Sequence, residues 1–233
     1  MLALDNAGVT KLFTRIFIIF QQKSTGKPKL PDIGGVVLCG GSSSRMQRPK
    51  ALLPFGESTS LQLVVDAVRA VASHVVVVAA PHQTLPELPQ DVEILRDSRE
   101  GLGPLAGIAL GLSHLEQTTE AAYVTGCDVP LLRPNFIQHL AHQLGNHDIV
   151  MASEVQYLHP LAAVYRTGLG KRAWELIEAN RMRPVFLREG VSTIDVTTGE
   201  LRQVDPQLES LQNMNAPADY EKLLAIWQSR QCE

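Results

Sequence analysis

From Ile33 onward, short apolar runs alternate along the chain with segments that repeat apolar residues at helical spacing. The run 74–80 (HVVVVAA) does not alternate with polar residues, which is typical of a strand buried on both faces. Segment 61–73 instead spaces its apolar residues three and four positions apart, as an amphipathic helix does. This order of elements predicts an α/β domain with a mainly parallel sheet and helices on both faces.

The same pattern predicts further strands and helices along the chain. The last predicted helix has a proline and acidic residues in its first turn. Strands are expected at 33–39, 74–80, 92–97, 121–128, 148–153, 161–166 and 192–196. Helices are expected at 61–73, 104–117, 133–144, 169–180 and 216–229.

Residues 1–32 differ from the rest of the chain. The apolar run Ile16–Phe20 is far shorter than the roughly 20 residues that a membrane span needs. Segment 21–32 is polar and rich in helix breakers, as linkers are. We therefore expect an N-terminal extension and linker at 1–32, packed on the surface or disordered, followed by one domain at 33–230. A weak anchor for a membrane or a partner is the alternative.

Composition excludes several classes of protein. Apolar residues make up 45% of the chain, charged residues 19%, and the formal net charge is −3, as in ordinary globular proteins. Without a basic excess, nucleic acid is not expected as the main partner. The three cysteines include no CxxC pair, so neither a zinc ribbon nor a disulfide framework is indicated, and a cytoplasmic protein is expected.

Polar or small residues stand where three of the predicted strands end. Gly40 follows the first strand, Asp97 ends the third and Asp128 ends the fourth. Ligands of open parallel sheets bind beyond the carboxyl ends of the strands. We therefore expect these residues to share one binding site.

Segment 38–50 (LCGGSSSRMQRPK) has the chemistry of a phosphate-binding loop. Gly40 and Gly41 allow close approach of the backbone, and Ser42 begins a run of three hydroxyl and N–H donors. Arg45 and Lys50 add charge-assisted bonds to a triphosphate. The spacing GxxxxGK[ST] of the Walker A loop is absent. A solvated Gly–Ser turn is the alternative.

The two aspartates each allow two interpretations. Asp128 can bind Mg²⁺, a hard cation that takes one or two carboxylates together with phosphates and water, or it can cap the turn before Pro130. Asp97 can contact a nucleotide or form an Asx-turn. Segment 101–106 imitates the dinucleotide motif G-x-G-x-x-A, but it follows the third strand rather than the first. A dinucleotide site is therefore not expected there.

Segment 38–50, with LLPFG after it, resembles the signature loop of the molybdenum cofactor guanylyltransferase family, and the resemblance extends from Gly34 to the last helix. GPLAG at 103–107 is a second signature. The family implies a three-layer α/β/α, Rossmann-like fold of the nucleotide-diphospho-sugar-transferase type. One departure is Gln47, where the family usually has glycine.

The resemblance also implies roles for individual residues. Arg45, Lys50 and Asp128 are expected to be catalytic, with Mg²⁺ on Asp128. The nucleotide-binding residues are expected to be Leu38, Cys39, Gly40, Gly41, Ser42, Lys50, Asp97, Gly103, Gly107 and Asp128.

The C-terminal half carries the expected acceptor side. Arg181 and Arg183 suit an anionic pterin phosphate, although cations are also common at a solvated helix end. NMNAP matches the family's N-x-N-x-P motif. We expect Asn213 and Asn215 to alternate on a short strand and to orient the acceptor or the waters of the metal.

The implied reaction is Mg²⁺-dependent transfer of GMP from GTP to the terminal phosphate of molybdopterin, with release of pyrophosphate. The double glycine at 40–41 resembles the GTP-using branch, whereas RPKALLP at 48–54 is common in a CTP-using branch, and we favour GTP. A sugar- or alcohol-phosphate acceptor and a non-catalytic cofactor carrier are further alternatives. The resemblance also allows transient contact with molybdoenzymes or cofactor-insertion proteins.

Overall fold

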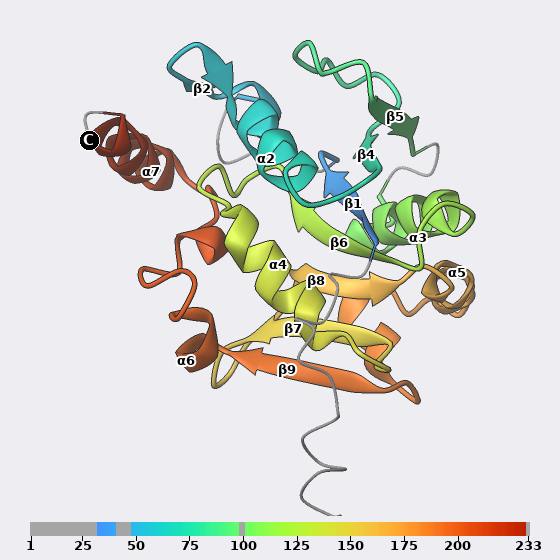
Figure 1. Ribbon diagram of the computed structural model, residues 1–233. Coiled ribbons are helices and arrows are strands. Elements are labelled where there is room, and N and C mark those ends of the chain that lie inside the picture. The colour runs from blue at the N-terminus through green and yellow to red at the C-terminus, as the bar shows by residue number, and fades with distance from the viewer. Residues whose placement is uncertain (1–31, 41–47, 98–100, 232–233) are drawn as a thin grey trace, which may run out of the picture. The chain divides into compact units, whose positions relative to one another are not determined.

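The computed structural model describes residues 32–40, 48–97 and 101–231 of the 233-residue chain. Figure 1 shows a twisted sheet between two layers of helices. The expected extension at 1–32 lies almost wholly outside the described residues, so the division at residues 32 and 33 stays a prediction. No helix in the described part is long and apolar enough to cross a bilayer.

Among the described residues, the main sheet has seven strands in the order β5-β4-β1-β6-β8-β7-β9. Their bounds are β1 (Ile33–Leu38), β4 (Val75–Ala79), β5 (Val92–Arg96), β6 (Ala121–Gly126), β7 (Ile149–Ser153), β8 (Leu158–Arg166) and β9 (Thr193–Thr197). Strand β8 runs antiparallel to β6 and β7, and the other neighbouring pairs are parallel. The prediction of a mainly parallel α/β sheet is confirmed.

In the part of the chain that the structure describes, helices cover both faces of the sheet (Figure 1). Helices α3 (Pro104–Leu115) and α5 (Leu169–Glu178) lie on one face, and α2 (Ser60–Arg69) and α4 (Pro134–Gln143) lie on the other. Successive residues of β1 point to opposite layers. A Cβ added at Gly111 of α3 would lie 2.5 Å from Val36, and one added at Gly35 would lie 2.2 Å from Val68 of α2. Because Gly111 and Gly35 have no side chain, the helices of both layers can pack close to the central strand β1.

The parallel register brings the carboxyl ends of four strands to one edge of the sheet. Leu38 of β1 pairs with Val78 of β4 and with Gly126 of β6, and Ala79 pairs with Arg96 of β5. The residues that come next on these strands are therefore neighbours: they are Cys39, Ala80, Asp97 and Cys127.

A second, smaller core joins three segments of the chain that carry predicted site residues. Its buried members are Leu53, Phe55, Leu131, Met214 and Leu223. Phe55 packs edge-on against Tyr220 and Trp227 of α7 (Pro217–Arg230). The hydroxyl of Tyr220 donates a hydrogen bond to the carbonyl of Pro54, at 2.7 Å. This core holds α7 against the segment that follows Lys50.

Some short elements have no counterpart in the sequence prediction. They are the hairpin of β2 (Pro54–Phe55) and β3 (Ser58–Thr59), helix α6 (Thr198–Leu201) and the 3₁₀ turns η1 (Lys50–Leu52), η2 (Pro184–Arg188) and η3 (Glu209–Leu211). The expected short strand at Asn213 and Asn215 is wrong, because this segment joins neither of the sheets formed by the described residues. One N–H of the segment, that of Met214, donates to the carbonyl of Asp128 at 2.9 Å.

Candidate functional site

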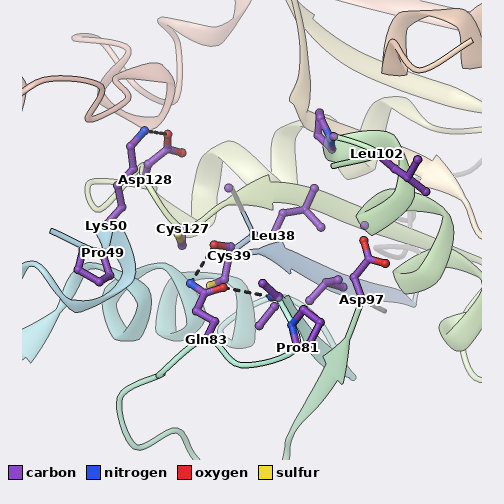
Figure 2. A pocket seen from close by; sticks show the side chains of 18 of the residues that line it. Leu38, Cys39, Pro49, Lys50, Pro81, Gln83, Asp97, Leu102, Cys127 and Asp128 are labelled. Carbon is purple, nitrogen blue, oxygen red and sulfur yellow. Dashed lines mark hydrogen bonds and ion pairs between the residues drawn. The ribbon is translucent and has the colours of Figure 1, made fainter. Parts of the chain in front are cut away.

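A cavity of about 1020 Å³ opens at the edge where the parallel strands end (Figure 2). Its lining comes from the ends of β1, β4, β5 and β6, segments 48–50 and 80–83, the start of α3, and Leu161 of β8. The structure brings eight of the predicted nucleotide-binding residues to this cavity. They are Leu38, Cys39, Gly40, Lys50, Asp97, Gly103, Gly107 and Asp128.

The start of α3 forms one wall of the cavity. Gly103 precedes the helix with a φ of +69°, a conformation that side chains other than glycine rarely adopt, and Pro104 fills the first turn. A Cβ added at Gly107 would lie 2.9 Å from Leu38, so glycine there lets the helix approach β1. The free N–H groups of this helix end, and its partial positive charge, therefore border the cavity.

The opposite wall is fixed by Gln83, a residue that the sequence analysis missed. Its side-chain amide donates to the carbonyl of Cys39 at 3.0 Å and accepts from the N–H of Ala80 at 3.2 Å (Figure 2). Arg96 of β5 donates to the carbonyls of Ala80 and Gln83, at 3.0 and 2.8 Å. Gln83 thus ties the ends of β1 and β4 together. No periodicity or motif in the sequence marks a loop glutamine for this task.

Three predicted residues from distant parts of the chain meet at the mouth of the cavity. The ammonium of Lys50 lies 3.0 Å from Oδ2 of Asp128 and 2.9 Å from Oδ1 of Asn215. The side chains of Lys50 and Asp128 are 20% and 18% exposed. Both side chains are therefore partly open to solvent, so a ligand that enters the cavity can reach them.

The backbone around Asp128 is firmly held. The N–H of Cys127 donates to the carbonyl of Leu38 at 3.0 Å, and the buried hydroxyl of Ser60 donates to the carbonyl of Cys127 at 2.6 Å. A Cβ added at Gly126 would lie 2.6 Å from Oδ1 of Asp128. The carboxylate therefore occupies space that only a glycine two residues earlier leaves open.

Cys39 lines the cavity as a neutral thiol. Hydrogen bonding with the thiol of Cys127 raises the pKa of Cys39 well above its usual value, and burial and the nearby charge of Asp128 raise this pKa further. A thiol with a raised pKa is a poor nucleophile. The site therefore does not offer Cys39 for a covalent intermediate.

The donor groups at the mouth fit a hard divalent cation. Asp128 and Asn215 present a carboxylate and an amide oxygen to the same positive charge, the ammonium of Lys50. Mg²⁺ commonly takes one or two carboxylates and completes its shell with phosphates and water. Within the described residues no cluster of three or more His, Cys, Asp or Glu side chains could hold a metal alone. Phosphate or water oxygens would complete the shell of a cation held by Asp128 and Asn215.

The predicted acceptor residues are not all brought together. Arg181 forms an ion pair with Glu189, holds the pKa of that carboxyl below its usual range, and stacks over Phe186 with 4.2 Å to the ring centre. Arg183 precedes η2 and is exposed. Neither arginine lines the cavity. Asn213 is exposed, one residue before the buried Met214.

Three predicted site residues lie outside the described residues: Gly41, Ser42 and Arg45. Their part in binding a triphosphate stays a prediction. The described ends of this loop, at Gly40 and Lys50, both line the cavity.

The chain is similar in sequence to a known protein family and to named proteins. Residues 35–193 match the profile of the MobA-like NTP transferase domain. A probable molybdenum cofactor guanylyltransferase of Mycobacterium avium is 36% identical over 205 residues, which cover 85% of this chain and 96% of that protein. A protein of the same description from Carboxydothermus hydrogenoformans is 32% identical over 192 residues, covering 82% of this chain and 94% of the relative.

A solved structure shows the same fold. Molybdopterin-guanine dinucleotide biosynthesis protein A of Archaeoglobus fulgidus superposes with a TM-score of 0.71. The match covers 84% of this chain and 100% of the other, at 21% sequence identity.

Proposed function

This chain belongs to the family of MobA-like NTP transferase domains and is a nucleotidyltransferase, and we propose that it transfers GMP from GTP to molybdopterin or the molybdenum cofactor. In this reaction an oxygen of the acceptor's terminal phosphate attacks the α-phosphorus of GTP. A new P–O bond forms, and the bond from the α-phosphorus to the bridging oxygen breaks, so that pyrophosphate leaves with that oxygen.

The observation that carries the proposal is the meeting of Lys50, Asp128 and Asn215 at the mouth of the cavity. Phosphoryl and nucleotidyl transfer need little covalent chemistry from the protein, because positioning and charge neutralisation supply most of the catalysis. In our proposal the ammonium of Lys50 exchanges its present oxygen partners for the triphosphate, and the cavity behind it receives the base and ribose.

Asp128 and Asn215 are the residues that we expect to hold Mg²⁺. A bound Mg²⁺ would neutralise charge on the phosphates. Arg45 and the glycine loop are expected to bind the rest of the triphosphate. Arg181, Arg183 and Asn213 stay proposals for the acceptor side, and so do a cytoplasmic location and transient contact with molybdoenzymes or cofactor-insertion proteins.

Thermal shift with GTP, CTP, ATP and UTP in the presence of Mg²⁺ tests the nucleotide. A ligand at 100 times its Kd adds about 2.7 kcal/mol to the free energy of unfolding, which is readily measured as a higher midpoint. We expect GTP to raise the midpoint most. The largest rise with CTP would assign the protein to cytidylyl transfer. Turnover with sugar or alcohol phosphates, and none with molybdopterin, would contradict the proposed acceptor.

A further inference from the structure

The segment that delivers Asn215 to the site is residues 205–215, which we call the C-terminal strap. It links α6 to α7 and is attached to the loop after β6 at two points. At its middle, Ser210 accepts a hydrogen bond at 3.1 Å from the N–H of Arg133. Near its end, the N–H of Met214 donates to the carbonyl of Asp128. The strap therefore follows the loop that carries the carboxylate of Asp128.

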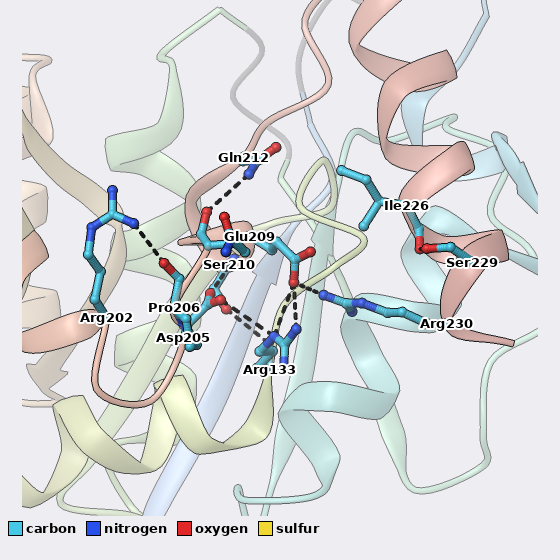
Figure 3. Close-up of polar contacts among 11 residues, drawn as sticks. Arg133, Arg202, Asp205, Pro206, Glu209, Ser210, Gln212, Ile226, Ser229 and Arg230 are labelled. Atoms are coloured by element: carbon cyan, nitrogen blue, oxygen red, sulfur yellow. Dashed lines mark hydrogen bonds and ion pairs between the residues drawn. The ribbon is translucent and has the colours of Figure 1, made fainter. Parts of the chain in front are cut away.

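A cluster of two buried carboxylates and two partly exposed arginines anchors the first half of the strap (Figure 3). Glu209 accepts hydrogen bonds from Nη2 and Nε of Arg133, at 2.6 and 3.2 Å, and forms an ion pair with Arg230. Arg133 precedes α4, and Arg230 ends α7. Asp205 lies 3.5 Å from Arg133 and accepts the N–H of Ser210 at 2.8 Å. One carboxylate of the strap thus connects two helices.

Burial of the two carboxylates favours one position of the strap. The side chains of Asp205 and Glu209 are 0% and 8% exposed, whereas those of Arg133 and Arg230 are 39% and 30% exposed. Buried charges tolerate the loss of a partner poorly, because the remaining charge is left without compensation. The strap is therefore most stable in the conformation that keeps Glu209 paired with both Arg133 and Arg230.

The other end of the strap enters the second core. Met214 is fully buried there with Leu53, three residues after Lys50, and with Leu131, three residues after Asp128. The segments that carry Lys50, Asp128 and Asn215 therefore share one packing unit. The matched domain profile ends at residue 193, before the strap begins. The mouth of the cavity is thus completed by a segment beyond the matched domain.

We propose that Glu209 is a positioning residue for nucleotidyl transfer: by clamping Arg133 and Arg230 it holds the strap so that Asn215 meets Lys50 beside Asp128. The proposal rests on the proposed function for its catalytic consequence. The clamp itself has a structural readout that does not depend on any substrate.

Amide exchange followed by NMR tests the clamp directly in the full chain. Glu209→Gln keeps the shape of the side chain and removes its charge. We expect exchange of the Met214 amide to become about tenfold faster, while the Cys39 amide, bonded to Val78, changes less than about twofold. Asp195→Asn is the matched control, because it breaks an exposed carboxylate–arginine pair on β9 and should change neither amide. Equal acceleration of both amides, or no change at Met214, would overturn the proposal.

Kinetics test the catalytic consequence. We expect Glu209→Gln to lower kcat about tenfold with an unchanged Kd for GTP, and to lower it by less than about twofold when Asn215 is already alanine. Additive losses in the double variant would show that Glu209 does not act through Asn215. If Glu209→Gln does not fold, Arg230→Lys replaces it in both assays. This substitution keeps the positive charge and removes the planar guanidinium. Arg230→Lys should then accelerate exchange at Met214 alone, and its wild-type behaviour in both assays would contradict the clamp.

The two tests separate the two proposals. Failure of GTP to bind, with selective exchange at Met214, would contradict the proposed function and leave the clamp intact. Binding of GTP without selective exchange would contradict the clamp alone.

Discussion

Lys50 and Asp128, 78 positions apart in the sequence, form an ion pair with 3.0 Å between Nζ and Oδ2 at the mouth of the cavity. The pair is partly exposed, so solvent screens it and its own contribution to stability is small. Its importance lies in placing a cation and a carboxylate where a triphosphate and a metal would meet.

Asp128→Asn tests the carboxylate. The substitution keeps the size of the side chain and removes the negative charge, so we expect kcat to fall about 10²- to 10³-fold, as for the loss of one electrostatic stabiliser. Asp91→Asn, at an exposed pair with Arg69, is the matched control and should leave kcat unchanged. Turnover near that of the wild type at saturating Mg²⁺ would contradict the role of Asp128.

Gly126→Ala tests the space that the carboxylate occupies. The added Cβ would lie 2.6 Å from Oδ1 of Asp128, which forces this side chain to move. We expect kcat to fall at least about tenfold, because small misplacements at a reacting site are costly. Gly168→Ala is the control, since its nearest neighbour would be 3.8 Å away. Equal kinetics of the two variants would mean that the position of the carboxylate is unimportant.

Gln83→Ala tests the wall between β1 and β4. Two hydrogen bonds are lost, one at the end of β1 and one at the end of β4, each worth about 1 kcal/mol net. We expect the KM for GTP to rise about tenfold, with a smaller change in kcat. Gln203→Ala removes the same side chain from an exposed position and should change neither constant. A fall in kcat with unchanged KM would place Gln83 in the chemical step instead.

The carboxylate of Asp219, at the start of α7, should make the stability of the protein depend on pH. Its carboxylate accepts the N–H groups of Asn215 and Ala216, at 2.9 and 2.8 Å, and these bonds hold its pKa below the usual value. A pKa lowered by folding adds stability above the pKa of the unfolded chain, and this stability is lost as the pH falls through the folded pKa.

We therefore expect Asp219→Asn to lower the thermal midpoint at pH 7. The difference from the wild type should shrink below about pH 4, where the unfolded carboxyl is protonated. Thermal melts from pH 7 to pH 3 measure this difference. A difference that stays constant over the whole range would contradict the assignment.

The sequence predicts most of the regular elements because burial imposes clear patterns on them. Strands β1, β4 and β6 are buried along their whole length, and their runs of apolar and small residues mark them. The hairpin of β2 and β3 leaves no such pattern, since it has only two residues in each strand. Alternation alone predicts a strand around Asn215, but no strand among the described residues pairs with this segment.

The site is only partly predictable for a similar reason. Strand ends and a glycine loop locate Asp97, Asp128 and Lys50, because local sequence determines which residues follow a strand. The contact of Asn215 with Lys50 depends on the path of the strap, which Glu209 and Met214 fix through contacts distant in sequence. The contacts of Gln83 likewise depend on how two strand ends meet.

Release of pyrophosphate from GTP in the presence of molybdopterin and Mg²⁺ tests the central claim most directly. We predict one pyrophosphate for each acceptor consumed by the wild-type chain, and release slowed at least about 10²-fold in Asp128→Asn. No release from GTP with the wild type, or equal release with Asp128→Asn, would contradict the account.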